Sequence, residues 1–354
     1  MAKSVSAANI VPSDPSTGWN EPLPHGGDLA AGRRSFPDAP EPFIDLSTGI
    51  NPNPYPLSRL PVDAFARLPD ADKLARVTAM AAQIYGASSG IHVVAAPGTQ
   101  ILLPLVAALV RPGRAAVLAP SYGEFARAAN LAGHEITMVR DLAAIRAARL
   151  VFLANPNNPD GRLFSRNDLM SLAGNLSTHD GLLVVDEAFM DAAPAAESLA
   201  GEVSVGNIVV LRSFGKFFGL AGLRLGFALA APEIATRLAA TLGPWAVSGP
   251  ALAIGAKALA DAAWIKRTRS RLAKSAARLD DLLTDSGLDI VGGTNLFRLA
   301  RTDAAIELFH HLGRAGILVR RFTEQPQWLR FGLPANEKAW RRLQIALAAS
   351  KKSR

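Results

Sequence analysis

Short apolar runs alternate with segments of helical periodicity from about residue 61 onward. The apolar runs are nearly continuous, which is typical of strands buried on both faces of a mostly parallel sheet. Seven strands are predicted, at His92–Ala96, Ala115–Ala119, Glu135–Val139, Leu150–Ala154, Leu182–Asp186, Ile208–Arg212 and Leu225–Leu229. Helices are expected between strands, at Gln100–Val110, Gly123–Ala132 and Arg166–Ala173. The pattern therefore predicts an α/β fold.

The segments on either side of this region have a different character. Residues 1–60 are rich in Pro, Gly and Asn, which is typical of irregular structure. A break at Pro244–Pro250 precedes a long helical stretch from Ala251 to about Thr284, and shorter elements follow. We expect an N-terminal arm (1–60) that contributes to a small domain and to the active site, a large domain (61–249) and a small C-terminal α/β domain (250–354).

Composition narrows the class of protein. The 354 residues are 49% hydrophobic and 19% charged, enough for a packed core. Cysteine is absent, which excludes disulfides, thiolate zinc sites and thiol catalysis, and no metal site is predicted. No apolar run approaches the ~20 residues of a membrane span, and residues 1–20 lack the apolar core of a secretion signal. We expect a cytoplasmic protein without a membrane partner.

The chain carries a net charge of +8, which indicates an anionic partner. The densest basic cluster, Lys266 to Lys274, lies in a helical pattern beside Asp280 and Asp281 and contains no interleaved aromatic residues. This arrangement favours a solvated helix face over a nucleic-acid interface, for which aromatic residues would be expected. No nucleic-acid partner is predicted, which leaves a small anion.

Lys216 lies just past the end of a predicted strand, where ligands collect in α/β sheets. Its neighbours are aromatic residues and glycines, and such surroundings lower the pKa of an amine and make it nucleophilic. Ser213 and Arg224, at positions −3 and +8, are placed to hold an anion beside it. By itself, a lysine at a strand end is more often a surface residue, so other segments must support this assignment.

Two further strand ends carry polar groups. Asp186 ends an apolar strand, where a carboxylate either caps a helix or serves as the counter-ion of a cofactor ring. Asn158 lies in Asn-Pro-Asn-Asn-Pro-Asp-Gly after another strand, a composition that equally suits a plain turn. Together with Lys216, polar or reactive side chains therefore follow three predicted strands. Parallel strands would bring these three side chains to one edge of a sheet.

An anion site is predicted where Gly98, Thr99 and Gln100 precede a helix without acidic residues in its first turn. Tyr122 opens another helix and is suited to stack on a flat ring. A phosphate cradle, an aromatic lid, a hydrogen-bond donor, a carboxylate and an amine are together what pyridoxal 5′-phosphate requires. The sequence thus predicts this cofactor.

From about His25 to Pro334 the chain resembles the fold-type I pyridoxal-phosphate enzymes of the class I/II aminotransferase superfamily, through five ordered motifs. The resemblance implies a large domain with a mostly parallel seven-stranded sheet and a smaller α/β domain. It also implies that Lys216 forms the Schiff base with the cofactor, that Asp186 keeps the ring nitrogen protonated and that Asn158 bonds the ring O3′.

The same resemblance assigns Ser213, Arg224 and the amides of Gly98 to Gln100 to the cofactor phosphate. It implies that Tyr55 reaches the phosphate of a neighbouring subunit, and therefore a homodimer. Arg330, in Trp-Leu-Arg-Phe-Gly, resembles the arginine that binds the substrate α-carboxylate. Arg320, in Gly-Ile-Leu-Val-Arg, resembles one that helps to hold an anionic substrate.

Three positions depart from the family pattern. Phe189 stands where many relatives have a tyrosine that bonds O3′, which leaves Asn158 alone in that role. Gly215 precedes the lysine in place of Ser or Thr, and Asp160 replaces the Thr of the common Asn-Pro-Thr-Gly motif.

The N-terminal motifs His-Gly-Gly from His25 and Ser-Thr-Gly-Ile-Asn-Pro from Ser47 are similar to those of the threonine-phosphate decarboxylases of cobalamin biosynthesis. This similarity implies a phosphorylated amino-acid substrate, L-threonine O-3-phosphate, bound with help from His25, Asn51 and Asn157. Histidinol-phosphate aminotransferases share most of the cofactor motifs and are the alternative. The residues serve either reaction, so which arginine holds carboxylate and which phosphate, and whether Lys216 is the general acid, stay open.

Overall fold

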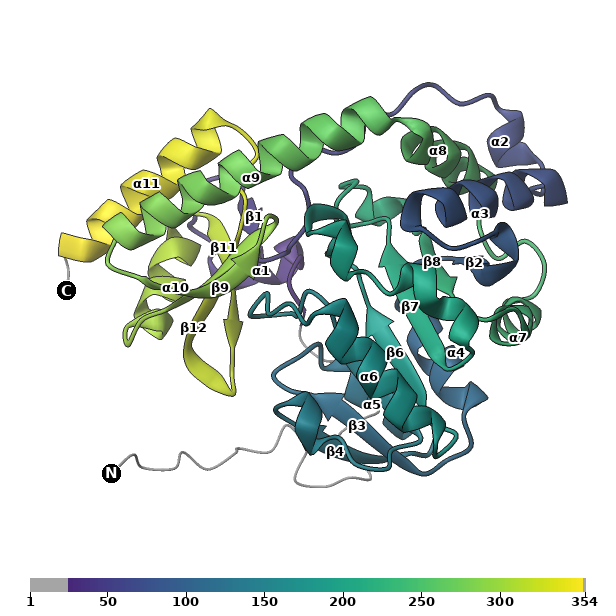
Figure 1. The fold of residues 1–354 in the computed structure, drawn as a ribbon. Coiled ribbons are helices and arrows are strands. Elements are labelled where there is room, and N and C mark those ends of the chain that lie inside the picture. Colours follow the sequence, from purple (N-terminus) through teal and green to yellow (C-terminus); the bar gives the residue numbers. More distant parts are fainter. Residues whose placement is uncertain (1–24, 353–354) are drawn as a thin grey trace.

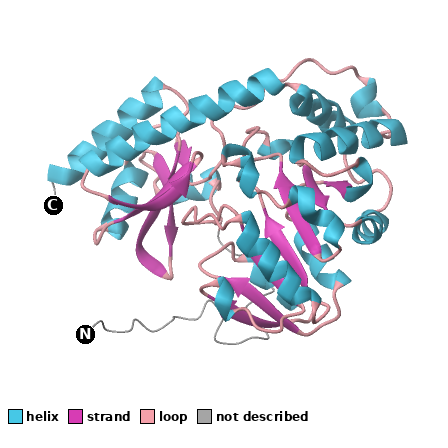
Figure 2. Ribbon diagram, viewed as in Figure 1, coloured by secondary structure: helices cyan, strands magenta, loops and turns pink. Residues whose placement is uncertain are grey.

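The computed structural model describes residues 25–352 and contains two β-sheets, each packed with helices (Figures 1 and 2). The larger sheet has seven strands in the order β2-β8-β7-β6-β5-β3-β4, and in this sheet only β8 runs antiparallel to its neighbours. Its strands are β2 (Val93–Ala96), β3 (Arg114–Leu118), β4 (Glu135–Val139), β5 (Leu150–Ala154), β6 (Leu182–Asp186), β7 (Ile208–Ser213) and β8 (Gly226–Leu229). The predicted mostly parallel seven-stranded sheet is confirmed.

Helices cover both faces of this sheet, which explains the nearly continuous apolar strands. Val184 and Val209 belong to one buried cluster, whereas Val185 and Val210, one residue further along each strand, belong to the other. Successive side chains of a strand point to opposite faces, so both faces must be apolar. The covering helices are α3 (Ala71–Tyr85), α4 (Leu102–Leu109), α5 (Glu124–Leu131), α6 (Arg166–Ser177), α7 (Pro232–Leu242) and α8 (Gly249–Ala260).

The predicted continuous helical stretch from Ala251 to Thr284 is wrong in one respect, because two helices meet at Asp261. The first is α8, and the second is α9 (Ala262–Asp285). The Asp261 carboxylate accepts a hydrogen bond from the Trp264 amide at 2.8 Å and so caps the start of α9. The other predicted elements are displaced by only a few residues at their ends.

The second sheet has the strand order β1-β11-β12-β10-β9. Its strands are β1 (Ile44–Leu46), β9 (Asp289–Thr294), β10 (Phe297–Arg301), β11 (Ile317–Phe322) and β12 (Gln325–Gly332). Strand β1 pairs parallel with β11 although they lie far apart in the sequence, so the segment expected to be irregular supplies an edge strand. The domain boundaries at 60 and 249 stay a prediction.

Helix α9 extends from the seven-stranded sheet to the second sheet and connects the two halves (Figure 1). The remaining helices are α1 (Leu29–Ser35), α2 (Asp63–Ala66), α10 (Ala305–Arg314) and α11 (Glu337–Lys352). Short 3-10 helices lie at Gly90–His92, Leu142–Ala144, Met190–Ala192, Ala195–Glu197, Ala200–Val205 and Ala221–Leu223. Between residues 25 and 352, no helix combines the length and apolar character needed to cross a bilayer.

Candidate active site

The carboxyl ends of β5, β6 and β7 bring three predicted residues to one edge of the large sheet. The three strands are parallel neighbours, and the register pairs Ala154 with Asp186 and Asp186 with Leu211. Asn158 follows β5, Asp186 ends β6, and Lys216 follows β7. The topology therefore collects the amide, the carboxylate and the amine where α/β sheets bind ligands.

The end of β2 and the start of β8 lie at the same edge, because Gly226 pairs with both Ala96 and Ser213. This register places Ser213 and the Gly98–Gln100 turn beside Arg224. Gly98 has a φ of +90°, and a Cβ at this position would lie only 2.6 Å from a terminal nitrogen of the Arg224 guanidinium. The close approach requires glycine and forms a cradle of backbone amides and one cation.

Lys216 and Asp186 have perturbed acidities. Burial, reinforced by the charges of Arg330 and Arg224, lowers the pKa of Lys216 to about 8, while Asp186 acts in the opposite direction. Burial raises the pKa of Asp186 to about 6, opposed by the Ala188 amide and by Lys216. Near neutral pH the site thus offers both a carboxylate, suited to hold a cation, and an amine that is partly unprotonated and nucleophilic.

Residues 51–55 of the N-terminal arm support the loop that carries Lys216. The Asn51 amide donates to the Lys216 carbonyl at 2.9 Å, and the Asn51 side chain donates to the Phe217 carbonyl at 2.8 Å. The Tyr55 amide continues the pairing with the Phe218 carbonyl at 2.8 Å. The Asn51 side chain also accepts a hydrogen bond from the Asn53 amide at 3.0 Å, so both of its polar atoms already have partners within the protein. Its predicted role in substrate binding stays a prediction.

Arg330 is buried on β12 and reaches the edge of the large sheet from the second sheet. Its Nη1 donates to Asn158 Oδ1 at 2.5 Å and its Nη2 to the Ser47 carbonyl at 2.9 Å, whereas its buried Nε has no partner. Burial, with help from Arg320, lowers the pKa of Arg330 to about 10. Within residues 25–352, no carboxylate forms a salt bridge with this guanidinium.

Arg320 lies directly opposite Arg330, because the two residues are paired in the antiparallel register of β11 and β12. Like charges directly opposite each other destabilise a sheet, so an anion bound here would be favourable. Burial lowers the pKa of Arg320 as well, so both cations lack part of their hydration. The pair is a candidate site for an anionic ligand.

Phe189, the departure from the family pattern, forms an apolar wall beside Lys216. The Lys216 Nζ lies 5.6 Å from the centre of its ring, and the ring packs edge-on against Phe297 at 5.0 Å. A Cβ on Gly49 would lie 2.9 Å from both rings, so the wall is tightly packed. Arg330 lies 5.0 Å over the Phe297 ring. The Phe189 ring therefore faces the Lys216 amine and the Phe297 ring faces Arg330, and neither ring carries a hydroxyl group.

Glu124, which the sequence analysis did not identify, joins three predicted residues. Its carboxylate lies 3.1 Å from His25 Nε2 and accepts from Gln100 Nε2 at 2.7 Å, and Gln100 in turn accepts from the Tyr122 hydroxyl at 2.9 Å. Glu124 is buried, and it lies among the buried residues Phe125, Ala128 and Ala129 of α5. The sequence did contain a signal for Glu124, because it is an acidic residue on the apolar face of a predicted helix.

Asn157 is fully buried and its hydrogen bonds lie within its own surroundings. Its amide donates to the Pro120 carbonyl and to Asp160, each at 2.8 Å, and its oxygen accepts from Ser121 at 3.2 Å. Asp160 also accepts from the Arg162 amide at 3.0 Å, which explains an acid in place of the usual threonine. The predicted substrate contact of Asn157 stays a prediction that these bonds do not favour.

Tyr55 extends away from the strand ends. Its hydroxyl lies 3.5 Å from the Lys257 carbonyl and from Asp261 at the junction of α8 and α9, and its ring packs against Trp264. No hydrogen bond described between residues 25 and 352 joins its side chain to Lys216 or Arg224. A groove between the Tyr55 segment, α3 and α8 opens beside it.

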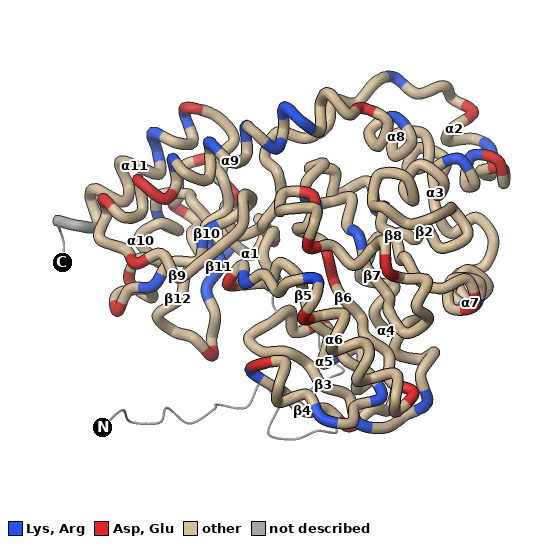
Figure 3. The backbone as a smooth tube through the Cα atoms, viewed as in Figure 1, with Lys and Arg blue, Asp and Glu red and all other residues tan. Residues whose placement is uncertain are grey.

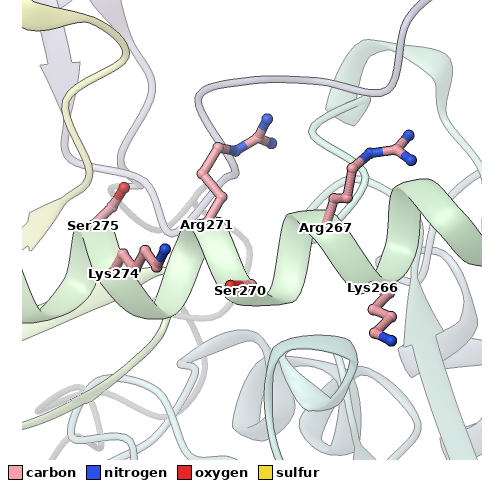
Figure 4. Close-up of a pocket in the computed structure, with 6 residues that line it drawn as sticks. All are labelled: Lys266, Arg267, Ser270, Arg271, Lys274 and Ser275. Carbon is pink, nitrogen blue, oxygen red and sulfur yellow. The ribbon is translucent and has the colours of Figure 1, made fainter.

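A separate hollow follows α9 (Figure 4). It is lined by Lys266, Arg267, Ser270, Arg271, Lys274 and Ser275. Figure 3 shows the same helix as a row of basic positions. All four cations are exposed, and Trp264, Leu272 and Leu279 form the buried face. These features agree with the solvated helix face expected from the sequence.

Residues 61–343 match the sequence family "Aminotransferase class I and II". The chain belongs to this family. A threonine-phosphate decarboxylase from a Sinorhizobium species is 42% identical over 92% of this chain and 98% of its own length. A threonine-phosphate decarboxylase from Pseudomonas aeruginosa is 40% identical over 93% of this chain and 98% of its own. A histidinol-phosphate aminotransferase from Shewanella amazonensis is 30% identical over 77% and 80%.

Two solved structures share the fold of this chain. Histidinol-phosphate aminotransferase from Sinorhizobium meliloti, in complex with pyridoxal-5′-phosphate, covers 99% of both chains with a TM-score of 0.80 and 22% identity. L-threonine-O-3-phosphate decarboxylase from Porphyromonas gingivalis covers 82% of this chain and 94% of its own, with a TM-score of 0.69 and 21% identity. At these identities the likeness shows the fold alone, which confirms the fold class expected from the sequence.

Proposed function

We propose that this protein is a pyridoxal-phosphate-dependent carboxy-lyase of cobalamin biosynthesis. It converts L-threonine O-3-phosphate into (R)-1-amino-2-propanol O-2-phosphate and CO2. The observation that carries the proposal is the cross-strand pair Arg320 and Arg330 beside the Lys216 edge, which suits a substrate with two anionic groups. The choice of reaction is supported by 42% identity to a threonine-phosphate decarboxylase over 92% of the chain.

The residues at the strand edge fit pyridoxal 5′-phosphate. Lys216 is a partly buried amine with a lowered pKa, as covalent attachment requires, and Asp186 is the carboxylate for the ring nitrogen. Arg224, Ser213 and the Gly98–Gln100 amides would hold the phosphate, and the side chain of Gly98 could not be larger. When bound, this cofactor supplies an electron sink for the bond that breaks at Cα.

Two further groups complete the proposed cofactor site. Asn158 would hold the ring oxygen, and its bond to Arg330 couples that position to the substrate carboxylate. Tyr122 would lie against the ring. Burial and the charges of Glu124 and Asp186 raise the pKa of Tyr122, so its hydroxyl stays protonated and donates to Gln100.

Arg330 orients the substrate carboxylate. Its unpartnered buried Nε and its delocalised charge suit a two-pronged contact with a carboxylate. The rings of Phe189 and Phe297 form the wall next to it and exclude water. When the bond to the carboxylate carbon breaks, neutral CO2 leaves and the electron pair stays on Cα, where the bound cofactor would delocalise it.

Arg320 and His25 hold the substrate phosphate in this proposal, and Asn51 and Asn157 are the remaining predicted contacts. Fixing carboxylate and phosphate at separate points determines which bond at Cα breaks. A shift of about 1 Å in this placement can change the rate of a reaction 10²-fold. The same residues could therefore serve an aminotransferase if the substrate were turned.

Lys216 moves the proton. The bond between Cα and the carboxylate carbon breaks, CO2 leaves, and Lys216 Nζ gives a proton to Cα, so that a C–H bond replaces the C–C bond. With a pKa of about 8 in the protein, the amine can both hold and release a proton near neutral pH.

The test compares two reactions. Purified protein with pyridoxal phosphate is incubated with O-phospho-L-threonine while CO2 and aminopropanol phosphate are measured. In parallel, histidinol phosphate and 2-oxoglutarate are supplied and glutamate is measured. We expect turnover in the first assay. Turnover only in the second would replace the decarboxylase with the aminotransferase suggested by the relatives at 30% identity.

A homodimer is proposed as the working unit. Leu57, Val62, Phe65 and Leu68 are each at least 64% exposed, next to the Tyr55 groove, and such a patch typically lies in an interface. A second copy bound there would bring Tyr55 toward a neighbouring cofactor site. Sedimentation should show a dimer for the wild type and a monomer for Phe65→Asp with Leu68→Asp; a monomeric wild type would refute the dimer. The cytoplasmic location stays a prediction that cell fractionation can check.

A further inference from the structure

Glu124 is a buried carboxylate that joins three segments of the chain. It is 4% exposed, and its two oxygens meet His25 of the N-terminal arm, Gln100 of the turn after β2 and Arg127 of its own helix. A carboxylate that served only the start of α5 would need Arg127 and the helix dipole alone. The contacts to His25 and Gln100 therefore require another explanation.

One side of Glu124 reaches the proposed cofactor pocket. Gln100 donates to Glu124 at 2.7 Å and accepts from Tyr122 at 2.9 Å, so the carboxylate fixes the orientation of the Gln100 amide. The charges of Glu124, Asp186, Arg224 and Arg320 all act on the pKa of Tyr122. Tyr122 thus lies within electrostatic range of Asp186 and Arg224 at the strand edge and of Arg320 on β11.

The other side of Glu124 reaches the arm. The His25 ring lies 5.6 Å from the Tyr122 ring, and His25 Nε2 lies 3.1 Å from Glu124. The next two residues pack on Ser47, because the Gly27 amide donates to its hydroxyl at 2.8 Å and a Cβ on Gly26 would collide with its carbonyl. That same carbonyl accepts from Arg330. The His-Gly-Gly motif therefore runs from Glu124 to the carboxylate-binding arginine.

We propose that Glu124 is a positioning residue that fastens the N-terminal arm to the strand edge and closes the pocket over the substrate phosphate. The proposal rests on the proposed function, because it takes His25 as a phosphate contact. Glu124 holds the imidazole of an exposed residue in one place, so that binding the substrate does not have to order it. Its loss weakens substrate binding more than the chemical step.

The kinetic test uses holoenzyme and O-phospho-L-threonine with Glu124→Gln, His25→Ala and the double variant. Glu135→Gln is the matched control, because Glu135 is exposed on β4 of the same half. We expect each single variant to raise KM about tenfold, the effect of one hydrogen bond to a charged group, with kcat within about threefold. The double variant should equal His25→Ala, since in this proposal Glu124 acts on the substrate phosphate through the His25 imidazole.

The proposal is wrong if the KM increases of the two single variants multiply in the double variant. It is also wrong if Glu124→Gln leaves KM unchanged. Hydrogen exchange of peptides from residues 25–49 provides a readout independent of activity. Exchange should accelerate in Glu124→Gln and His25→Ala and not in Glu135→Gln. Unchanged exchange would refute the fastening of the arm even if the wild type does not decarboxylate the substrate, whereas an inactive wild type with accelerated exchange in the variants would refute only the proposed function.

Discussion

Arg320 and Arg330 lie directly opposite each other on β11 and β12. Both guanidinium groups lose hydration on burial, and their mutual repulsion lowers the pKa of Arg330 further. Like charges directly opposite each other destabilise a sheet, and an anionic ligand between these two would offset the repulsion. Asn158, the neighbour of this pair, connects it to the edge of the large sheet.

Arg330→Met should lower kcat/KM for O-phospho-L-threonine by about 100-fold, because a buried charged contact to the substrate is lost. The guanidinium forms no salt bridge within residues 25–352, so its charge is available to the substrate and is lost in the variant. Steady-state kinetics check this. Arg321→Met is the control, since Arg321 is the exposed neighbour on β11; equal effects of the two variants would contradict the assignment.

Lys216 should react at an unusually low pH in the cofactor-free protein. Its pKa of about 8 means that the nucleophilic neutral amine appears above that pH, whereas ordinary lysines require about 10.4. Reductive methylation, followed by mass spectrometry of the peptide, should show a midpoint near pH 8. Asp186→Asn should move the midpoint lower, because the Asp186 charge raises this pKa. A midpoint near 10 would show that burial does not act on the amine.

Gly98→Ala should weaken the binding of pyridoxal phosphate at least about tenfold and cost about 1–3 kcal/mol of stability. The new Cβ would meet the Arg224 guanidinium, and the φ of +90° is unfavourable for alanine. Titration of the cofactor-free protein, followed by the absorbance of the bound cofactor, measures the affinity. Gly222→Ala is the matched control, because nothing lies within 4 Å of its Cβ position; a loss of affinity there too would argue against a specific clash.

Arg212→Met should lower the free energy of unfolding by about 3–5 kcal/mol, because it leaves buried carboxylates unpaired. Arg212 lies 3.0 Å from Glu187 and 3.4 Å from Asp191, and all three are buried. Denaturant unfolding provides the measurement. Arg278→Met removes the exposed pair with Glu337 and should cost less than about 1 kcal/mol. If both variants lost a similar amount of unfolding free energy, burial of the ion pair would not explain the effect.

The cluster around Arg212 also shows how the fold supports the site. Glu187 directly follows Asp186, and Arg212 directly precedes Ser213, so their ion pair joins the ends of β6 and β7 behind the strand edge. Asp186 and Ser213 were predicted to belong to the site from the sequence, whereas their neighbours Glu187 and Arg212 were not. An acid and a base adjacent to site residues give no local signal that they meet, since they are 25 positions apart.

By itself, the sequence determined the large sheet and the set of groups at its edge. Strands with continuous apolar residues must be covered on both faces, and the carboxyl ends of parallel strands meet at one edge, so Asn158, Asp186 and Lys216 were expected at the same edge. Only the tertiary structure decided which residues meet across the halves of the molecule. The opposition of Arg320 and Arg330, the pairing of β1 with β11 and the contact of Glu124 with His25 depend on register and on packing between distant segments. Local sequence patterns encode neither the register nor the packing between distant segments. The periodicity of a strand indicates which face is buried, but not which segment packs against that face.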